Sequence, residues 1–439
     1  MKAAHRPAAS GIGVSAGGPP RIPQIDALKG FALLGICVVN APVLAGAWDL
    51  TSGPGTTAAD RAVAWLVTAL FTTKFYLIFS FLFGYSFVLQ EAAADRDRIR
   101  FARRHWRRFL GLFLIGLAHA ALLYPGDILM TYAVLSVALF AARRLGARTA
   151  LRTAALLVVF LTAVFLTVGV TVLWLDDPGR VTESTAATAG RGAAYRGGPL
   201  SVVHANITAY RETLGSAIVY AVHLLAAALA GLAAGRRGLL KAPGASRART
   251  SAVHRRLLVT GLLVGLPGGV LTAMCTHGPL DDRFYYLGQA VDILTAPALA
   301  AAYAAALLLI LRGRHGRRIA RTLAPAGRMS LSNYLLQSGV LAFVFTGYGF
   351  GLYGTVGPAV LTGACVALWA VQLALSARLM AFTRYGPAEL LLRRLTLGRT
   401  VLRAARATGR PTYPDTDGEV RRARAPCRGD GMAEGFRVG

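Results

Sequence analysis

The first apolar run, residues 21–46, constrains the fold of this chain more than any other stretch. A basic leader passes through Asp26 and Lys29 into an apolar segment that is long enough to cross the hydrocarbon core of a bilayer, with a single amide, Asn40, inside it. We interpret this run as a first transmembrane helix with polar groups near both ends. Because its apolar part is longer than that of a typical signal peptide, we expect a retained anchor and not a cleaved leader.

Composition places the chain among membrane proteins with several spans. Of its 439 residues, 55% are hydrophobic and 15% are charged, and the mean hydropathy is +0.50, which is too apolar for a water-soluble fold of this length. The formal net charge is +28, but the arginines stand in short clusters between apolar segments, as they do beside membrane surfaces. We therefore expect the lipid bilayer as a partner and no nucleic acid. The four cysteines have neither CxxC nor metal-ligand spacing, so no metal site is expected.

The alternation of apolar segments and loops predicts an all-α bundle of about ten transmembrane helices. Both termini are expected in the cytoplasm, because every loop assigned to the inside is rich in arginine and every loop assigned to the outside is not. The membrane domain is expected over residues 21–397, between a disordered leader, 1–20, and a disordered basic tail, 398–439. One sizeable external loop with little structure is expected at about 176–212.

Two of the expected spans are unusually short. They cover about 107–124 and 126–142 and are joined by a tight turn at Pro125 and Gly126. Both flanks of this hairpin are basic, so the turn is expected to point outward or into the membrane. The pair either crosses the membrane fully or forms a re-entrant hairpin. The second span is expected over about 63–90.

Polar side chains inside spans are costly, so each requires a partner or a function. By topology, one set converges on the outer half of the bundle, and we interpret His119 and Asp127 as catalytic. They are eight residues apart across the tight turn, an arrangement that could orient a histidine as a general base. The alternative is a structural hydrogen bond. The candidate substrate-binding residues of this layer are Asn40, Lys74 and Asp292, although Lys74 could instead serve as an interfacial anchor.

A second polar set lies toward the cytoplasmic side, where a donor would bind. The candidate donor-binding residues are Asp26, Lys29, Ser332, Asn333 and Gln337. Each also has a structural interpretation: Asp26 could cap a helix, Lys29 could extend to the headgroups, and the two amides could bond neighbouring helices. Two polar layers in one bundle indicate a path or cavity between the leaflets. P-loop, GxGxxG, GxSxG and HExxH motifs are missing, which argues against ATP-driven transport and serine hydrolysis.

Several motifs spread over residues 21–397 resemble the YeiB-like family of bacterial inner-membrane proteins, which is catalogued as domain of unknown function 418. They are DALKGFALLGI at 26–36, KF at 74–75, FSFLFG at 79–84, GLAH at 116–119, GDIL at 126–129, GRMSLSNYLLQS at 327–338 and GPAE at 386–389. The block at 327–338 and the His119/Asp127 pair are the most specific of these.

The YeiB-like family in turn is similar to the wider set of transmembrane acyltransferases. Those proteins move an acyl group from a cytoplasmic donor such as acetyl-CoA to an extracytoplasmic acceptor, using a histidine within the membrane. The resemblance implies a multi-pass protein of the bacterial inner membrane, with acyl-CoA as a candidate co-substrate and no bound cofactor. Two positions depart from the pattern: Lys29 stands where arginine is usual and lacks its bidentate fork, and His119 lies in the third span instead of beside the first.

Two hypotheses for function follow from these observations. The first is an acyltransferase in which a donor enters near Lys29 and His119 activates a small-molecule acceptor at the outer layer. The second is a transporter or channel for a small polar or amphipathic solute, in which the same polar groups line a route. A membrane scaffold without chemistry is a third reading, and the oligomeric state is left open.

Overall fold

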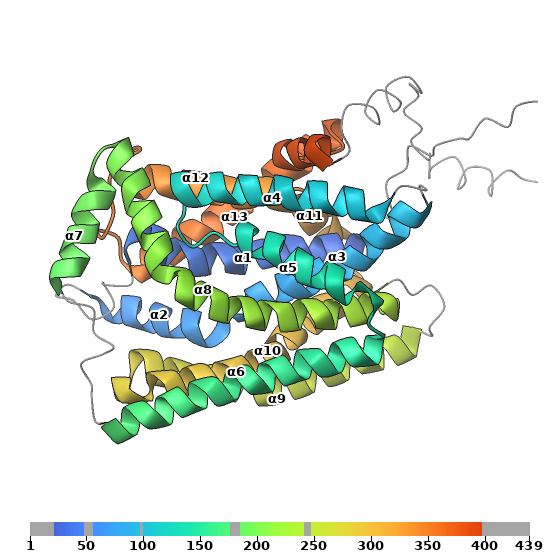
Figure 1. Cartoon of the computed structure of the whole chain (residues 1–439), viewed down its shortest axis with the longest axis horizontal. Helices are drawn as coiled ribbons and strands as arrows, with labels where there is room; N and C mark the ends of the chain where they lie inside the picture. Colours follow the sequence, from blue (N-terminus) through green and yellow to red (C-terminus); the bar gives the residue numbers. More distant parts are fainter. Residues whose placement is uncertain (1–21, 48–55, 97–99, 176–184, 241–246, 397–439) are drawn as a thin grey trace, which may run out of the picture. The chain divides into compact units, whose positions relative to one another are not determined.

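A computed structural model describes residues 22–47, 56–96, 100–175, 185–240 and 247–396. Within these ranges every regular element is a helix, which confirms the predicted all-α class. The predicted leader 1–20 and tail 398–439 lie outside the described residues. Successive long helices run back and forth between two ends of one bundle, so that helices far apart in the sequence lie side by side (Figure 1).

The helices follow one another with short connections. In chain order they are α1 (Pro23–Ala45), α2 (Ala58–Leu70), α3 (Lys74–Arg96), α4 (Phe101–Leu122), α5 (Leu129–Ala141), α6 (Ala147–Leu175), α7 (Thr185–Arg196), α8 (Pro199–Arg236), α9 (Arg247–His277), α10 (Tyr285–Arg312), α11 (Gly316–Arg328), α12 (Ser330–Phe345) and α13 (Pro358–Phe382). Residues 387–396 form a further helical segment.

In the part of the chain that is described, 7 helical segments are long and apolar enough to cross a membrane, with α2 and α3 counted together. The chain is therefore a multi-pass membrane protein. Three helices that correspond to expected spans fall short of this measure: α12 has 16 residues, α5 has 13, and α4 carries four arginines in its first eight residues. The count of about ten spans stays a prediction for this reason.

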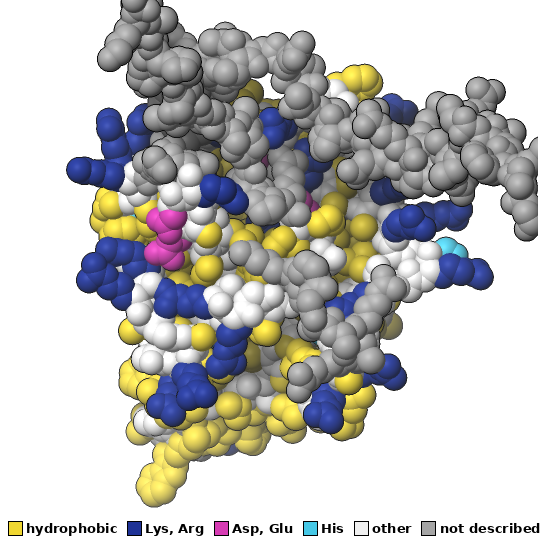
Figure 2. Space-filling view, turned by 90° about the vertical axis from the view of Figure 1, so that its right-hand side faces the viewer, with side chains coloured by type: hydrophobic (Ala, Val, Ile, Leu, Met, Phe, Trp, Pro, Cys, Tyr) yellow, Lys and Arg dark blue, Asp and Glu magenta, His cyan; other side chains and the backbone are white. Residues whose placement is uncertain are grey.

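The two ends of the bundle differ in charge. Lys and Arg side chains surround the face shown in Figure 2, which we call the basic end. It gathers α11 with the last turns of α3, α8 and α10 and the first turns of α4 and α9. The other end, which we call the turn end, contains the Pro125–Gly126 turn, α7 and the 346–357 segment between α12 and α13. Hydrogen bonds join its parts, as from Tyr348 Oη to Leu122 O at 2.6 Å.

The expected second span is broken in the structure. Helix α2 ends at Leu70 and α3 begins at Lys74, and between them Thr73 has a φ of 70°, in the left-handed region that a branched residue seldom adopts. Carbonyl groups freed at the end of α2 find other donors: Tyr303 Oη donates to Leu70 O at 3.0 Å. The break places the first turn of α3 inside the bundle instead of at its surface.

The expected external loop at 176–212 is largely helical. Residues 176–184 lie outside the described part, but α7 begins at Thr185 and α8 begins at Pro199. The Tyr195 ring stacks on Tyr353 with centroids 4.7 Å apart, and Arg196 donates to the carbonyl of Tyr353 at 3.1 Å. Burial raises the pKa of Tyr195, so its phenol stays neutral. Proline favours the first turn of a helix, and α8 begins at Pro199, so it is longer than the span expected at 215–234.

Glycines set the closest helix crossings. A Cβ atom built at Gly84 in α3 would stand 1.8 Å from Ala228 O in α8, and one at Gly231 would stand 1.9 Å from Phe81 O. The backbones of α3 and α8 therefore touch, which requires glycine at both positions. By contrast, a Cβ at the exposed Gly363 in α13 meets nothing within 4 Å.

We predict that Gly84→Ala lowers the stability of the protein by about 1–3 kcal/mol or more, because the added methyl group overpacks the α3–α8 crossing. Gly363→Ala serves as the matched control and should leave stability unchanged or raised by about 0.5–1 kcal/mol, since alanine favours helix. Thermal or denaturant unfolding in detergent compares the two. Equal stability of both variants would contradict the crossing.

Candidate functional site

His119 and Asp127 form a buried pair across the turn between α4 and α5. The Nδ1 atom of His119 lies 2.8 Å from Oδ1 of Asp127, and the two side chains are 1% and 0% exposed. The other carboxylate oxygen accepts the backbone N–H of Met130 at 2.8 Å. Asp127 thus fixes the imidazole on one side. The Nε2 atom of His119 is buried and has no hydrogen-bond partner among the described residues.

Aromatic side chains enclose this pair. The ring of Tyr334 in α12 lies 4.9 Å from the imidazole, centroid to centroid, and the ring of Tyr124 lies 6.1 Å away. Tyr334 is within electrostatic range of both Asp127 and Tyr76. The Tyr76 hydroxyl donates to Oδ1 of Asn40, which links the amide of α1 to the same region. We call His119, Asp127, Tyr124 and Tyr334 the histidine site.

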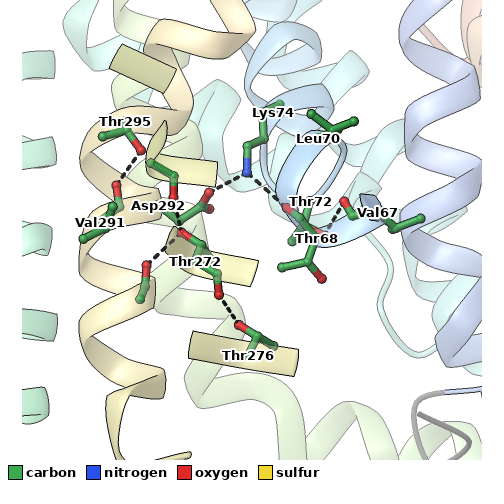
Figure 3. A network of polar contacts seen from close by, with 12 residues as sticks. Val67, Thr68, Leu70, Thr72, Lys74, Thr272, Thr276, Val291, Asp292 and Thr295 are labelled. Carbon is green, nitrogen blue, oxygen red and sulfur yellow. Dashed lines mark hydrogen bonds and ion pairs between the residues drawn. The ribbon is translucent and has the colours of Figure 1, made fainter. Parts of the chain in front are cut away.

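Lys74 and Asp292 form the second buried pair. Lys74 Nζ lies 2.6 Å from Asp292 Oδ1 in α10, with side chains 0% and 3% exposed. The ammonium group also donates to Thr68 O, near the end of α2, at 3.3 Å (Figure 3). Lysine at the first position of α3 therefore joins three helical segments at the break. The structure thus brings these two candidate substrate-binding residues together, and the charged group of each is paired with that of the other.

Two histidines lie close to this ion pair. His277 at the end of α9 hydrogen-bonds Thr68 Oγ1 through Nε2 at 2.8 Å. His223 in α8 is buried, lies within electrostatic range of Asp292, and its Nε2 has no partner among the described residues. Within the same part of the chain, no group of three or more His, Cys, Asp or Glu side chains is placed to hold a metal ion.

At the basic end, Lys29 is half-buried and lies within electrostatic range of Asp26 and of Glu389 in the 387–396 helix. Glu389 is fixed at the start of α12. Its Oε1 atom accepts the backbone N–H groups of Leu331 and Ser332 at 2.7 and 3.1 Å, and its Oε2 atom accepts the Ser332 hydroxyl at 2.5 Å. The Glu389 carboxylate thus caps the start of α12, and the Ser332 hydroxyl donates to it. The Glu389 carboxylate is thus occupied by α12, and Lys29 is the half-buried cation beside it.

Asn333 and Gln337 bond neighbouring helices. Asn333 Nδ2 donates to Ser376 Oγ at 3.0 Å, and Gln337 Nε2 donates to Gln372 Oε1 at 2.8 Å, both on α13. Gln372 Nε2 returns a bond to Asn333 O at 2.9 Å, and Gln337 reaches Leu33 O in α1 at 3.3 Å. These contacts match the structural interpretation of the two amides. If either amide bound a donor, it would first have to break one of these hydrogen bonds between helices.

Comparison with known proteins gives a consistent relationship. The family model described as "Protein of unknown function (DUF418)" matches residues 234–399. The protein titled "Uncharacterized protein YxaH" of Bacillus subtilis (strain 168) is 28% identical over 400 residues, covering 86% of this chain and 94% of that protein. "Uncharacterized protein YeiB" of Escherichia coli (strain K12) is 25% identical over 391 residues, covering 85% and 95%. Residues 234–399 therefore match the DUF418 family, and the chain is similar over most of its length to YeiB and YxaH.

The matched region of this YeiB-like protein contains the Lys74 partner, Asp292, and the Asn333 and Gln337 amides, whereas His119 and Asp127 precede it. The predicted resemblance to the YeiB-like family is thereby confirmed. The relation to acyltransferases has no counterpart among the titles of these relatives and stays a proposal.

Two polar residues of the YeiB-like protein lie in short sequence patterns that indicate a structural role, Asp60 and Glu389. Asp60 closes a capping box with Thr57 at the start of α2, and its Oδ1 also accepts the N–H of Ala359 at the start of α13 at 3.0 Å. The Thr-x-x-Asp spacing indicates the first role. Glu389 lies in the GPAE motif, but its contact with the start of α12 joins residues 58 positions apart and could not be predicted from the motif. Gln372 and Tyr76 had no local signal, because they lie within apolar and aromatic runs.

We predict that Lys74→Met destabilises the YeiB-like protein by about 3–5 kcal/mol, because it leaves the Asp292 carboxylate buried without its partner. The double variant Lys74→Met/Asp292→Leu should recover most of that loss, since neither charge remains. Unfolding in detergent measures both.

The exposed pair Arg283–Asp281, with an N–O distance of 3.1 Å, supplies the control for this cycle. Arg283→Gln should leave stability close to wild type, because solvent screens an exposed pair. A Lys74→Met variant as stable as wild type would show that the buried pair contributes no net stability.

Proposed function

We propose that this YeiB-like protein is a transmembrane acyltransferase of the bacterial inner membrane. In this proposal about ten helical segments cross the bilayer, the basic end faces the cytoplasm and the turn end faces outward, as the arginine distribution predicts. An acyl group passes from a cytoplasmic thioester such as acyl-CoA to a hydroxyl or amine of an extracytoplasmic small molecule.

The buried His119–Asp127 pair is the observation that carries the proposal. An ionised Asp127 accepts a hydrogen bond from Nδ1–H, which leaves the lone pair of the neutral imidazole on Nε2. That atom is buried and has no partner among the described residues. A base prepared in this way, with its orientation fixed from behind, is what abstraction of a proton from an acceptor requires. Of the buried histidines that leave a ring nitrogen without a partner among the described residues, only His119 is also held by a carboxylate at hydrogen-bonding distance.

The reaction would proceed through the histidine site. Nε2 of His119 takes the proton of the acceptor hydroxyl or amine as that atom attacks the thioester carbonyl, so that a C–O or C–N bond forms. The C–S bond then breaks, and the imidazolium returns the proton to the departing thiolate. Tyr334 and Tyr124 beside the imidazole keep bulk water away and offer hydroxyl groups to the developing oxyanion.

The remaining candidates are assigned by their present contacts. Lys29, half-buried at the basic end, contributes positive charge toward a donor phosphate, whereas Ser332 and the start of α12 are already bound by the Glu389 carboxylate. Asn40, linked to the histidine site through Tyr76, is the acceptor-binding candidate that needs least rearrangement. Lys74 and Asp292 would bind an acceptor only after their ion pair opens.

A transporter or channel for a small polar or amphipathic solute is the second candidate. It is favoured by one specific observation, the ion pair at the break between α2 and α3, since interrupted helices with buried charges near the membrane interior are typical of transporters. Solute flux in proteoliposomes without any acyl donor would support this reading over the enzyme.

We predict that His119→Gln reduces acyl transfer by about 10²–10⁴-fold, because glutamine fills the site but cannot act as a base. The assay uses labelled acetyl-CoA with proteoliposomes and an extract of bacterial envelope components, and it follows both free thiol and transferred label. The double variant His119→Gln/Asp127→Asn should be no slower than the single one, since the pair acts as a unit.

His105→Gln is the matched control for this assay. His105 is a second buried histidine of α4, stacked on Phe140 with centroids 4.8 Å apart, and lies outside the histidine site. It should retain transfer. Wild-type activity in folded His119→Gln protein would rule out the assigned role.

A further inference from the structure

Helix α11 has two unlike sides at the basic end. One side packs on α1 so closely that a Cβ at Gly327 would stand 1.8 Å from Asp26 O, and one at Gly30 would stand 2.1 Å from Leu323 O. The buried residues of α11 are Gly316, Leu323, Ala326 and Gly327. The helix is therefore fixed by backbone contact to the first helix of the bundle, and only its other side is free to meet an external partner.

That other side is a concentrated cationic surface. Arg317, Arg318 and Arg321 are exposed, and their guanidinium groups have no ion-pair or hydrogen-bond partner among the described residues. They lie three and four residues apart around Arg321, so they share one helix face. The sequence contains no acidic residue between Asp292 and Glu389. We call these three arginines the α11 arginine face.

This arrangement is unfavourable in the absence of anions. Like charges on one helix face repel one another. Arg317 and Arg318 also stand in the first turn of α11, where the helix dipole disfavours cations. By contrast, Arg312, at the end of α10, donates to Ser251 Oγ at 3.0 Å and so has a protein partner. An anion that bridges the α11 arginine face would remove both penalties.

The surroundings of α11 favour an anion that belongs to a lipid. The helix connects α10, which is apolar enough to cross a membrane, with the apolar helix α12, so it lies where a span reaches the bilayer surface. On the last turns of α10, Ile310 is 50% exposed. An acyl chain could therefore lie along α10 while its headgroup phosphate reaches the arginines.

We propose that Arg317, Arg318 and Arg321 bind the phosphate of an anionic phospholipid headgroup at the basic end of the bundle. Arginine offers planar, paired donors to phosphate oxygens, and three of them surround one headgroup. Because the opposite side of α11 is in backbone contact with α1, a bound headgroup stabilises the α1–α11 crossing. This proposal does not depend on the acyltransferase activity.

The experiment uses the full chain in nanodiscs of phosphatidylcholine, with and without phosphatidylglycerol. Each arginine at a membrane surface contributes about a fivefold factor in binding. We expect phosphatidylglycerol to raise the unfolding temperature of the wild-type protein. Arg317→Gln/Arg318→Gln/Arg321→Gln should bind phosphatidylglycerol about 100-fold more weakly and lose most of that rise, whereas the corresponding lysine variant should keep most of it.

Two controls keep the test decisive. Arg318→Gln alone is measured in case the triple variant fails to insert, and it should show an intermediate loss. Arg211→Gln, at an exposed position of α8 away from α11, should behave as wild type. Equal dependence on phosphatidylglycerol in wild-type and glutamine proteins would overturn the proposal. So would inorganic phosphate raising the unfolding temperature in phosphatidylcholine discs as much as the lipid does.

Discussion

The ion pair between Lys74 and Asp292 is the interaction on which the interior of this bundle depends. A lone charge at full burial is too costly to keep, so the lysine and the aspartate must meet. Their contact fixes the start of α3 against α10 and stabilises the break after α2. Two residues later, Tyr76 reaches Asn40. Because burial of the two charges requires the ion pair, and the ion pair fixes the start of α3, it also fixes the Tyr76 side chain near the histidine site.

The same requirement explains how the other polar residues of the interior are used. The amides of Asn333, Gln337 and Gln372 bond one another and the backbone across α12, α13 and α1. By contrast, four histidines have a buried ring nitrogen without a partner among the described residues: Nε2 of His105, His119 and His223, and Nδ1 of His254. A buried ring nitrogen without a protein partner can form a hydrogen bond to a ligand or exchange a proton with it. His119 alone is also oriented by a carboxylate at hydrogen-bonding distance.

Much of this organisation could be predicted from the sequence. The first helix, the arginine-rich end and the contact between His119 and Asp127 follow from apolar length, charge distribution and a short separation across a turn. The Lys74–Asp292 contact could not be predicted, since 218 residues separate the partners. The break at Thr73 was missed because it lies in an aromatic run without proline or glycine. Helix α7 was missed because its Gly/Ala/Thr composition is typical of a loop, and its stabilising contact, Tyr195 with Tyr353, is distant in the sequence.

The account depends on one arrangement above all: the basic end and the turn end must face opposite sides of the same membrane. Single cysteines at His315, beside α11, and at Phe350, between α12 and α13, test it in intact cells with a membrane-impermeant maleimide, because both positions are exposed. The native cysteines of the described part are buried, and Cys427 is replaced by serine. We expect labelling of His315→Cys only after the cells are opened and of Phe350→Cys without opening. Labelling of both positions from the same side would contradict the account.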